Sequence, residues 1–81
     1  MTPARKQELQ QMLFGEGYLP DFGAEAVRVS YDDGCKVYFA DDSWVICRFS
    51  GTEPLLRIAA EGNTKAQAAG YLQTWKNALG L

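Results

Sequence analysis

The chain has no histidine and only two cysteines among its 81 residues. Zinc sites are built from cysteine and histidine ligands, and two widely separated cysteines without histidine do not suffice for one. Cys35 and Cys47 both lie in strand-like stretches, where a buried free thiol is the expected state. A disulfide between neighbouring strands is the alternative.

The sequence also lacks a long apolar run, an apolar leader and an excess of basic residues. No run approaches the ~18 residues of a membrane span, and the N-terminus has no signal-peptide core. Eight Lys and Arg stand against ten Asp and Glu, for a net charge of −2, whereas nucleic-acid binders usually carry a basic excess. We therefore expect a soluble, cytoplasmic protein with no membrane and no nucleic-acid partner.

What remains is the composition of one small globular domain with a shallow core, at 47% hydrophobic, 12% aromatic and 22% charged residues. Its charge is uneven. Acidic residues dominate at 32–33 and 41–42, whereas arginines occur at positions 48 and 57. The average charge can therefore conceal a local positive site.

The first stretch, TPARKQELQQMLF, has the pattern of a helix. Thr2 can cap it, Pro3 suits the first helical position, and Leu9, Met12 and Leu13 recur at helical spacing. Gly15 and Gly17 then end it. The connection over 15–24 is open to two interpretations, a hinge or a plain surface loop.

Four strands follow, separated by short turns at 32–34, at 41–42 and after Phe49, and short turns imply antiparallel pairing. In the first strand Val27, Val29 and Tyr31 alternate with polar residues, which predicts a half-buried strand. The other three are CKVYFA, SWVICRF and LLRIAA. The aspartate pairs at 32–33 and 41–42 are expected to serve as turn residues and not as metal ligands.

A second helix is predicted over NTKAQAAGYLQTWKNALG, with Thr64 and Gln67 as a capping box and Gly80 at its end. Its apolar face is expected to hold Ala68, Leu72, Trp75 and Leu79, and Trp44 is also expected in the core. The order α-β-β-β-β-α predicts an α+β fold, a single four-stranded antiparallel sheet covered on one face by two helices.

The stretch RFSGTEPLLR, residues 48–57, connects the third and fourth strands. Symmetric pairing across this turn places Arg48 opposite Arg57 on one side of the sheet. Like charges directly opposite are destabilising, so either an anion lies between them or acids such as Glu53 and Glu61 neutralise them. Surface ion pairs of that kind are common, and the residues alone leave both possibilities open.

The same loop carries the other parts of an oxyanion site. Gly51 permits close approach of the backbone, Ser50 and Thr52 carry hydroxyl donors, and successive N–H groups can form an anion nest. Arginine offers a planar charged fork that matches phosphate oxygens. Pro54 stiffens the exit from the loop.

Residues 33–62, DGCKVYFADDSWVICRFSGTEPLLRIAAEG, resemble the C-terminal (fourth) domain of the α-D-phosphohexomutases, the phosphoglucomutase and phosphomannomutase family. The likeness lies in an Asp-Gly-x-Lys turn, an acidic hairpin followed by Ser-Trp, the Arg-x-Ser-Gly-Thr-Glu-Pro motif and a further Arg. It covers about residues 25–80. Phe49 stands where proline is common in the family.

The resemblance implies a fold of the TATA-binding-protein type and a role in binding the non-reacting phosphate of a phosphosugar. The matching phosphate-binding positions are Arg48, Ser50, Gly51, Thr52 and Arg57. It further implies that residues 1–81 form one domain of a longer phosphohexomutase. Such an enzyme is an isomerase that uses Mg²⁺ and contains further domains beside this one. Those domains and a hexose phosphate are then the expected partners. This chain itself is expected to hold no catalytic residue, no metal ligand and no cofactor, and to be inactive alone.

A second interpretation keeps the same fold but assigns it no catalytic role. In it the chain is a free-standing interaction module that binds a protein partner through a sheet edge. A third, a small nucleic-acid binder, is disfavoured by the absence of a basic face.

Overall fold

The computed structural model describes residues 2–32 and 34–81. It has helix α1 (Pro3–Gln10), the π-helical turn η1 (Gln11–Gly15), strands β1 (Ala26–Ser30), β2 (Cys35–Phe39), β3 (Trp44–Phe49) and β4 (Leu56–Glu61), and helix α2 (Lys65–Leu79). The predicted order α-β-β-β-β-α and the α+β class are confirmed.

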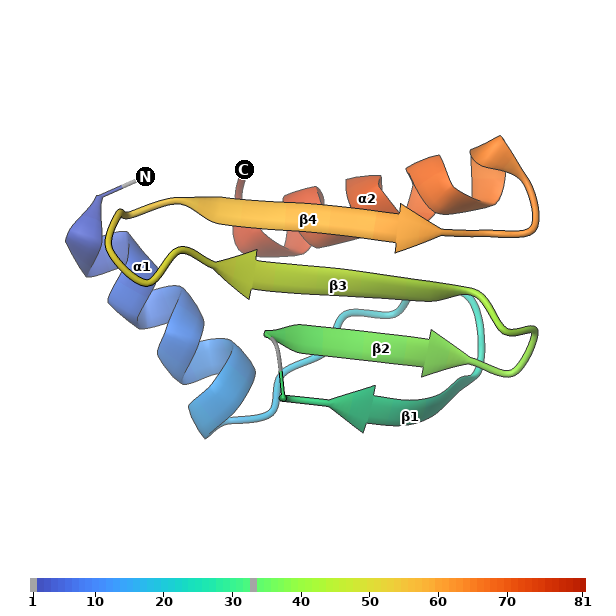
Figure 1. Cartoon of the computed structure of the whole chain (residues 1–81), viewed down its shortest axis with the longest axis horizontal. Coiled ribbons are helices and arrows are strands. Elements are labelled where there is room, and N and C mark those ends of the chain that lie inside the picture. Colours follow the sequence, from blue (N-terminus) through green and yellow to red (C-terminus); the bar gives the residue numbers. More distant parts are fainter. Residues whose placement is uncertain (1, 33) are drawn as a thin grey trace.

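The four strands form one antiparallel sheet in the order β1-β2-β3-β4, so every strand pairs with its neighbour in sequence (Figure 1). Gly34 has a φ of 87° and Asp42 a φ of 70°, the left-handed conformation that tight hairpin turns need. Asp33, predicted as a turn residue, lies outside the described residues.

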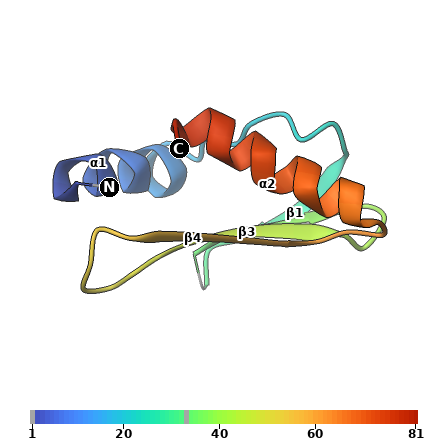
Figure 2. The same cartoon turned by 90° about the horizontal axis from the view of Figure 1, so that it is seen from above.

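Both helices lie on the same side of the sheet, and the other side is left open (Figure 2). The core forms between the helices and the sheet. Its buried members are Leu9, Leu13, Cys35, Val37, Phe39, Val45, Cys47, Tyr71, Trp75 and Leu79. The predicted covering of one face by two helices is therefore confirmed.

Helix α1 begins as its sequence predicts. The Thr2 hydroxyl oxygen accepts the Arg5 N–H at 3.1 Å, and Pro3 occupies the first turn. Beyond Gln10 the helix widens, because the Glu16 N–H bonds to the Gln11 carbonyl at 2.9 Å. Leu9 and Leu13 are fully buried against the sheet.

Helix α2 is capped by Thr64, whose hydroxyl oxygen accepts the Gln67 N–H at 3.0 Å. The Gln67 side-chain oxygen accepts the Asn63 N–H at 2.6 Å, one residue before the position of a standard capping box. Gly80 ends the helix with a φ of 72°.

The buried face of α2 differs in part from the prediction. Trp75 and Leu79 are buried as expected, but the third buried residue is Tyr71, whereas Ala68 and Leu72 are only partly covered. Tyr71 stacks on Phe39 with ring centroids 4.5 Å apart, which draws this side of the helix onto β2.

The predicted inward alternation of β1 is wrong at Val27 and Tyr31, which are 58% and 47% exposed. β1 is an edge strand, and its pairing with β2 shifts between Ala26 and Arg28. Val27 is the extra residue of this bulge, which redirects its side chain, whereas Tyr31 lies beyond the end of β1.

Trp44 was predicted in the core and lies instead on the open face of the sheet. Val45 and Cys47 on the same strand are buried beneath the helices, so the alternate residues Trp44 and Ile46 point the other way. The Trp44 indole N–H donates to the Glu61 carboxylate at 3.0 Å.

Candidate anion-binding site

Arg48 and Arg57 are direct partners in the pairing of β3 with β4. The symmetric register predicted from the sequence is therefore confirmed, and both side chains stand on the open face, exposed to solvent. Two cations opposed in this way repel each other. This end of the hairpin is consequently a place where an anion gains attraction from both strands.

Four of the eight Lys and Arg residues of the chain lie on the open face, by strand alternation and register. They are Arg28, Lys36, Arg48 and Arg57. Glu61 is on the same face, but it accepts from Trp44 and lies four strand residues, about 13 Å, from Arg57. Among the strand residues that the structure describes, the open face thus carries four cations and one carboxylate, although the chain is acidic overall.

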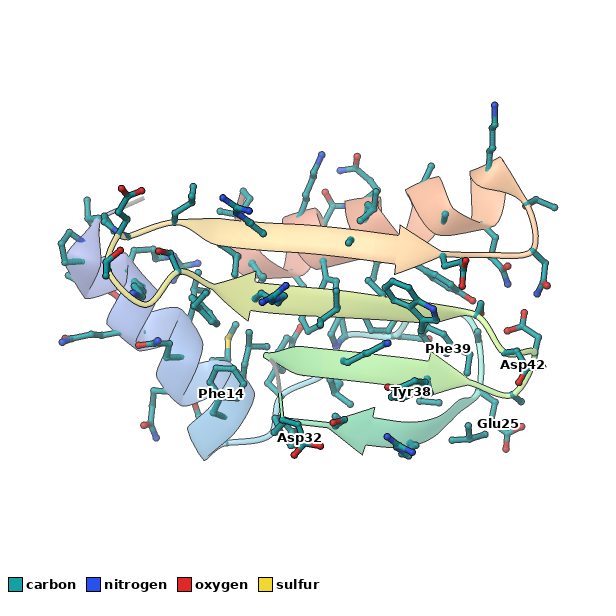
Figure 3. The ribbon with its side chains drawn as sticks, in the orientation of Figure 1. Phe14, Glu25, Asp32, Tyr38, Phe39 and Asp42 are labelled. Atoms are coloured by element: carbon teal, nitrogen blue, oxygen red, sulfur yellow. The ribbon has the colours of Figure 1, made fainter. Side chains whose placement is uncertain are left out.

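Two of these cations lie over aromatic rings. The Lys36 ammonium is 4.2 Å from the Trp44 ring centroid and 4.8 Å from that of Tyr38. The Arg28 guanidinium lies 4.6 Å from the centroid of the same Tyr38 ring. These are cation–π contacts within the sheet face. Figure 3 shows Tyr38 on this face, with Glu25 and Asp42 at one end of the sheet and Phe14 and Asp32 at the other.

The loop between β3 and β4 is closed on itself. The Ser50 N–H bonds to the Leu55 carbonyl at 2.9 Å. The Ser50 hydroxyl oxygen accepts the N–H groups of Thr52 at 3.4 Å and Glu53 at 3.2 Å. Because a hydroxyl oxygen that accepts twice still has its own hydrogen to donate, Ser50 can offer an O–H to a ligand from this arrangement.

A hollow of about 250 Å³ lies at the mouth of this loop, lined by Arg48, Phe49, Ser50, Gly51 and Arg57. Its volume is that of several water molecules, enough for a small anion. Four of the five predicted site residues thus line one hollow. Thr52 instead lines a neighbouring hollow on the side of α1, together with Lys6 and Glu53.

Gly51 is not needed for the shape of the loop. Its φ is not among the positive values of the chain, and a Cβ placed on it would meet no atom within 4 Å. The space beside it is open. The close approach to a ligand expected at this glycine fits the open space, and the loop makes no use of a positive φ here.

Gly34 lies directly against Arg48, although its place in the sequence predicts only a turn. A Cβ on Gly34 would lie 2.4 Å from the Cys47 carbonyl oxygen and 3.0 Å from Cγ of Arg48. The Arg48 side chain therefore passes directly over a position where no other residue fits. The Asp-Gly pair in the sequence marks Gly34 as a turn residue. Its contact with Arg48 could not be predicted from that pair, because the contact depends on the β2–β3 register.

Lys6 is a second residue that sequence reasoning missed. Its ammonium donates to the carbonyl oxygens of Ser50 at 2.5 Å and Glu53 at 3.1 Å. These contacts bring α1 against the loop at the end of the sheet (Figure 1). Lys6 and Ser50 are separated by 44 positions, and no local pattern marks such a pair.

The thiols and carboxylates of the described residues form no metal centre. No group of three or more His, Cys, Asp or Glu residues is placed to hold a metal ion in 2–32 and 34–81. Cys35 and Cys47 are free and buried, and face each other across β2 and β3. Burial raises the pKa of Cys35 to about 11 and that of Cys47 to about 12, so both thiols stay protonated at neutral pH.

Neither α1 nor α2 has the length and apolar character needed to cross a bilayer, and no other described helix does.

Residues 3–77 match the family model described as the phosphoglucomutase/phosphomannomutase C-terminal domain. The chain belongs to this family. The match covers α1, all four strands, the Arg48–Arg57 loop and α2 as far as Asn77. The resemblance deduced from the RFSGTEPLLR stretch is therefore confirmed at the level of the family.

Curated relatives agree with this assignment. A probable phosphoglucosamine mutase of Methanosphaera stadtmanae is 61% identical over 33 residues, covering 41% of this chain and 7% of the relative. A phosphoglucomutase/phosphomannomutase of Thermococcus kodakarensis is 44% identical over 46 residues, covering 57% of this chain and 10% of the relative. A probable phosphoglucosamine mutase of Methanothermobacter thermautotrophicus is 42% identical over 62 residues, covering 68% of this chain and 14% of the relative.

The chain therefore spans only about a tenth of the length of these mutases. No solved structure matches it at a significant level, so the TATA-binding-protein type of fold stays a prediction from the resemblance.

Proposed function

We propose that this chain is the phosphate-binding C-terminal domain of a phosphohexomutase, and that it holds the non-reacting phosphate of a hexose phosphate. The observation that carries the proposal is the pairing of Arg48 with Arg57 beside the hollow that Ser50 and Gly51 also line. Two guanidinium forks and a hydroxyl donor match the oxygens of a phosphate group.

In this proposal the domain contributes binding energy rather than chemistry. Holding a phosphate that does not react orients the sugar at the reacting end and so lowers the entropic part of the barrier. The positive open face around the arginines draws the anionic substrate to the loop.

The catalytic parts of the mutase are assigned outside this chain. The described residues contain no cluster able to hold a metal ion, so we assign no ligand of the expected Mg²⁺ to them and derive no step through it. The short coverage of the relatives supports a role as one domain of a longer enzyme.

The test is an NMR titration of the ¹⁵N-labelled chain with glucose 1-phosphate and, separately, with inorganic phosphate. We expect saturable shifts of the amides in 48–57, with weak affinity because a single phosphate makes few contacts. Arg48→Ala should weaken binding roughly ten- to hundredfold, the usual effect of losing charge-assisted hydrogen bonds.

Arg28→Ala is the matched control, because Arg28 is an exposed arginine of the same sheet face that pairs with Tyr38, away from the loop. It should leave the affinity within about twofold of the unsubstituted chain, by the ordinary behaviour of independent sites. Equal losses of affinity in both variants would show that the ligand responds to the overall charge of the face and not to a specific contact with Arg48. The absence of any saturable shift at millimolar ligand would sink the phosphate site and favour the interaction module.

A further inference from the structure

The loop that lines the anion hollow is held from behind by α1. Lys6 contacts it through the carbonyl oxygens of Ser50 and Glu53 and through no side chain of the loop in the described bonds. The Glu53 carbonyl also accepts the Leu55 N–H at 2.8 Å. Both carbonyls are therefore fixed on the α1 side.

The direction of a carbonyl fixes the direction of the N–H that shares its peptide plane. The described peptides are all trans, and in a trans peptide the C=O and the following N–H point in opposite directions. Because the Ser50 carbonyl points at Lys6, the Gly51 N–H points away from Lys6. Gly51 lines the hollow of the two arginines, whereas Lys6 lines the hollow on the other side of the loop.

We propose that Lys6 is a positioning residue for the phosphate site: by holding the Ser50 carbonyl, it aims the Gly51 N–H at the anion between Arg48 and Arg57. This inference rests on the proposed phosphate-binding function. It adds a main-chain donor to the two guanidinium groups and names the group that orients it.

The same contact removes an obstacle to anion binding. A carbonyl oxygen carries partial negative charge, and a loop glycine with open space around it can rotate its peptide easily. A flipped Ser50–Gly51 peptide would turn the carbonyl toward the phosphate and the N–H away from it. The ammonium of Lys6 opposes that flip, because it would lose a charge-assisted hydrogen bond.

The test compares Lys6→Met, Lys6→Arg and Lys65→Met in the ¹⁵N titration with glucose 1-phosphate. Methionine keeps much of the aliphatic stem of this half-buried side chain and removes the ammonium. We expect Lys6→Met to raise the Kd about three- to tenfold and to abolish the downfield shift of the Gly51 amide at saturation. Lys6→Arg, which keeps a cationic donor, should restore that shift and bring the Kd within about twofold.

Lys65→Met removes an equal charge from an exposed site at the start of α2 and should change neither quantity. A Gly51 amide that still moves downfield in Lys6→Met, with an unchanged Kd, would overturn the positioning role. If Lys6→Met loses the dispersed amide signals of the sheet, it has not folded, and Lys6→Arg decides the question. A folded Lys6→Arg variant that lacks the Gly51 shift and has a Kd raised about three- to tenfold would also overturn the positioning role. If the unsubstituted chain binds nothing, the phosphate site itself fails, and that outcome is distinct from the other two.

Discussion

Gly34 contributes to the candidate site by having no side chain. Its φ of 87° is one that other residues adopt only with strain. A Cβ there would also collide with the Cys47 carbonyl and press on Cγ of Arg48. The backbone collision cannot be relieved by rotating a side chain, so any substitution must move β2 against β3.

Gly34→Ala should therefore lower the free energy of unfolding by about 1–3 kcal/mol, the cost of a strained left-handed residue, and weaken phosphate binding through Arg48. Urea denaturation and the glucose 1-phosphate titration measure the two effects. Gly70→Ala is the control: Gly70 lies within α2 with open space around it, and alanine there should stabilise by up to about 1 kcal/mol. A Gly34→Ala variant as stable as the unsubstituted chain would contradict the collision.

At the scale of elements, the β2–β3 turn is tied to α2 by Asp41. The Asp41 carboxylate accepts from the Ser43 N–H at 3.0 Å, from the Ser43 hydroxyl and from the Gln67 side-chain amide at 2.7 Å. Ser43 is buried, and its hydroxyl oxygen lies 2.8 Å from the Tyr71 hydroxyl. Because Ser43 donates to Asp41, Tyr71 is the donor in this pair. The hairpin and the helix thus share one hydrogen-bond chain.

The hydrogen bonds from the Ser43 side chain, the Gln67 side chain and the Ser43 backbone lower the pKa of Asp41 from its ordinary 3.8 to about 2. A carboxyl group with a lowered folded-state pKa stabilises the fold above its unfolded value and loses that contribution as the pH falls through the folded value. We expect unfolding free energy, measured by urea denaturation, to fall between about pH 4 and pH 2, and to fall less in Asp41→Asn.

Asp42→Asn removes the neighbouring carboxylate and is the control, since asparagine tolerates the positive φ of this position. It should keep the acid sensitivity of the unsubstituted chain. Identical pH profiles for Asp41→Asn and the unsubstituted chain would show that this network does not respond to protonation.

The elements themselves were readable from the sequence because each has a local signal. Thr2 and Thr64 cap helices, and Gly80 ends one. Alternating residues and short turns fixed the strand order and the register of Arg48 with Arg57. These features depend on residues close together in the chain.

Other features depend on contacts that no local pattern records. The bulge in β1 adds Val27 to an edge strand and leaves the Val27 side chain exposed to solvent. Trp44 is large and apolar, which suggested the core, but the burial of Val45 on the same strand decides which way it points. The bonds of Lys6 to the loop join distant positions and could not be foreseen.

At the scale of the whole molecule, the two thiols report on the integrity of the sheet. Cys35 and Cys47 are fully buried partners on its two central strands, covered by the helices. A reagent can reach them only when β2, β3 and the helical layer separate.

Ellman's reagent at neutral pH should therefore modify the native chain at least about a thousandfold more slowly than the urea-unfolded chain, because opening requires most of the folding free energy. Rapid modification of one or both thiols without urea would contradict this and would show local separation of the central strands. The absorbance released over time measures the rate, and mass spectrometry counts the modified thiols.

The docking of α1 joins residues that are far apart in the chain. Each strand pairs with its neighbour in sequence, so the sheet forms through short loops whose closure costs little entropy. Arg5, next to Lys6, donates to the Leu79 carbonyl at 2.8 Å across 74 positions, nearly the length of the chain. We therefore expect α1 to dock after the sheet has formed, so that the loop gains its support from Lys6 late in folding.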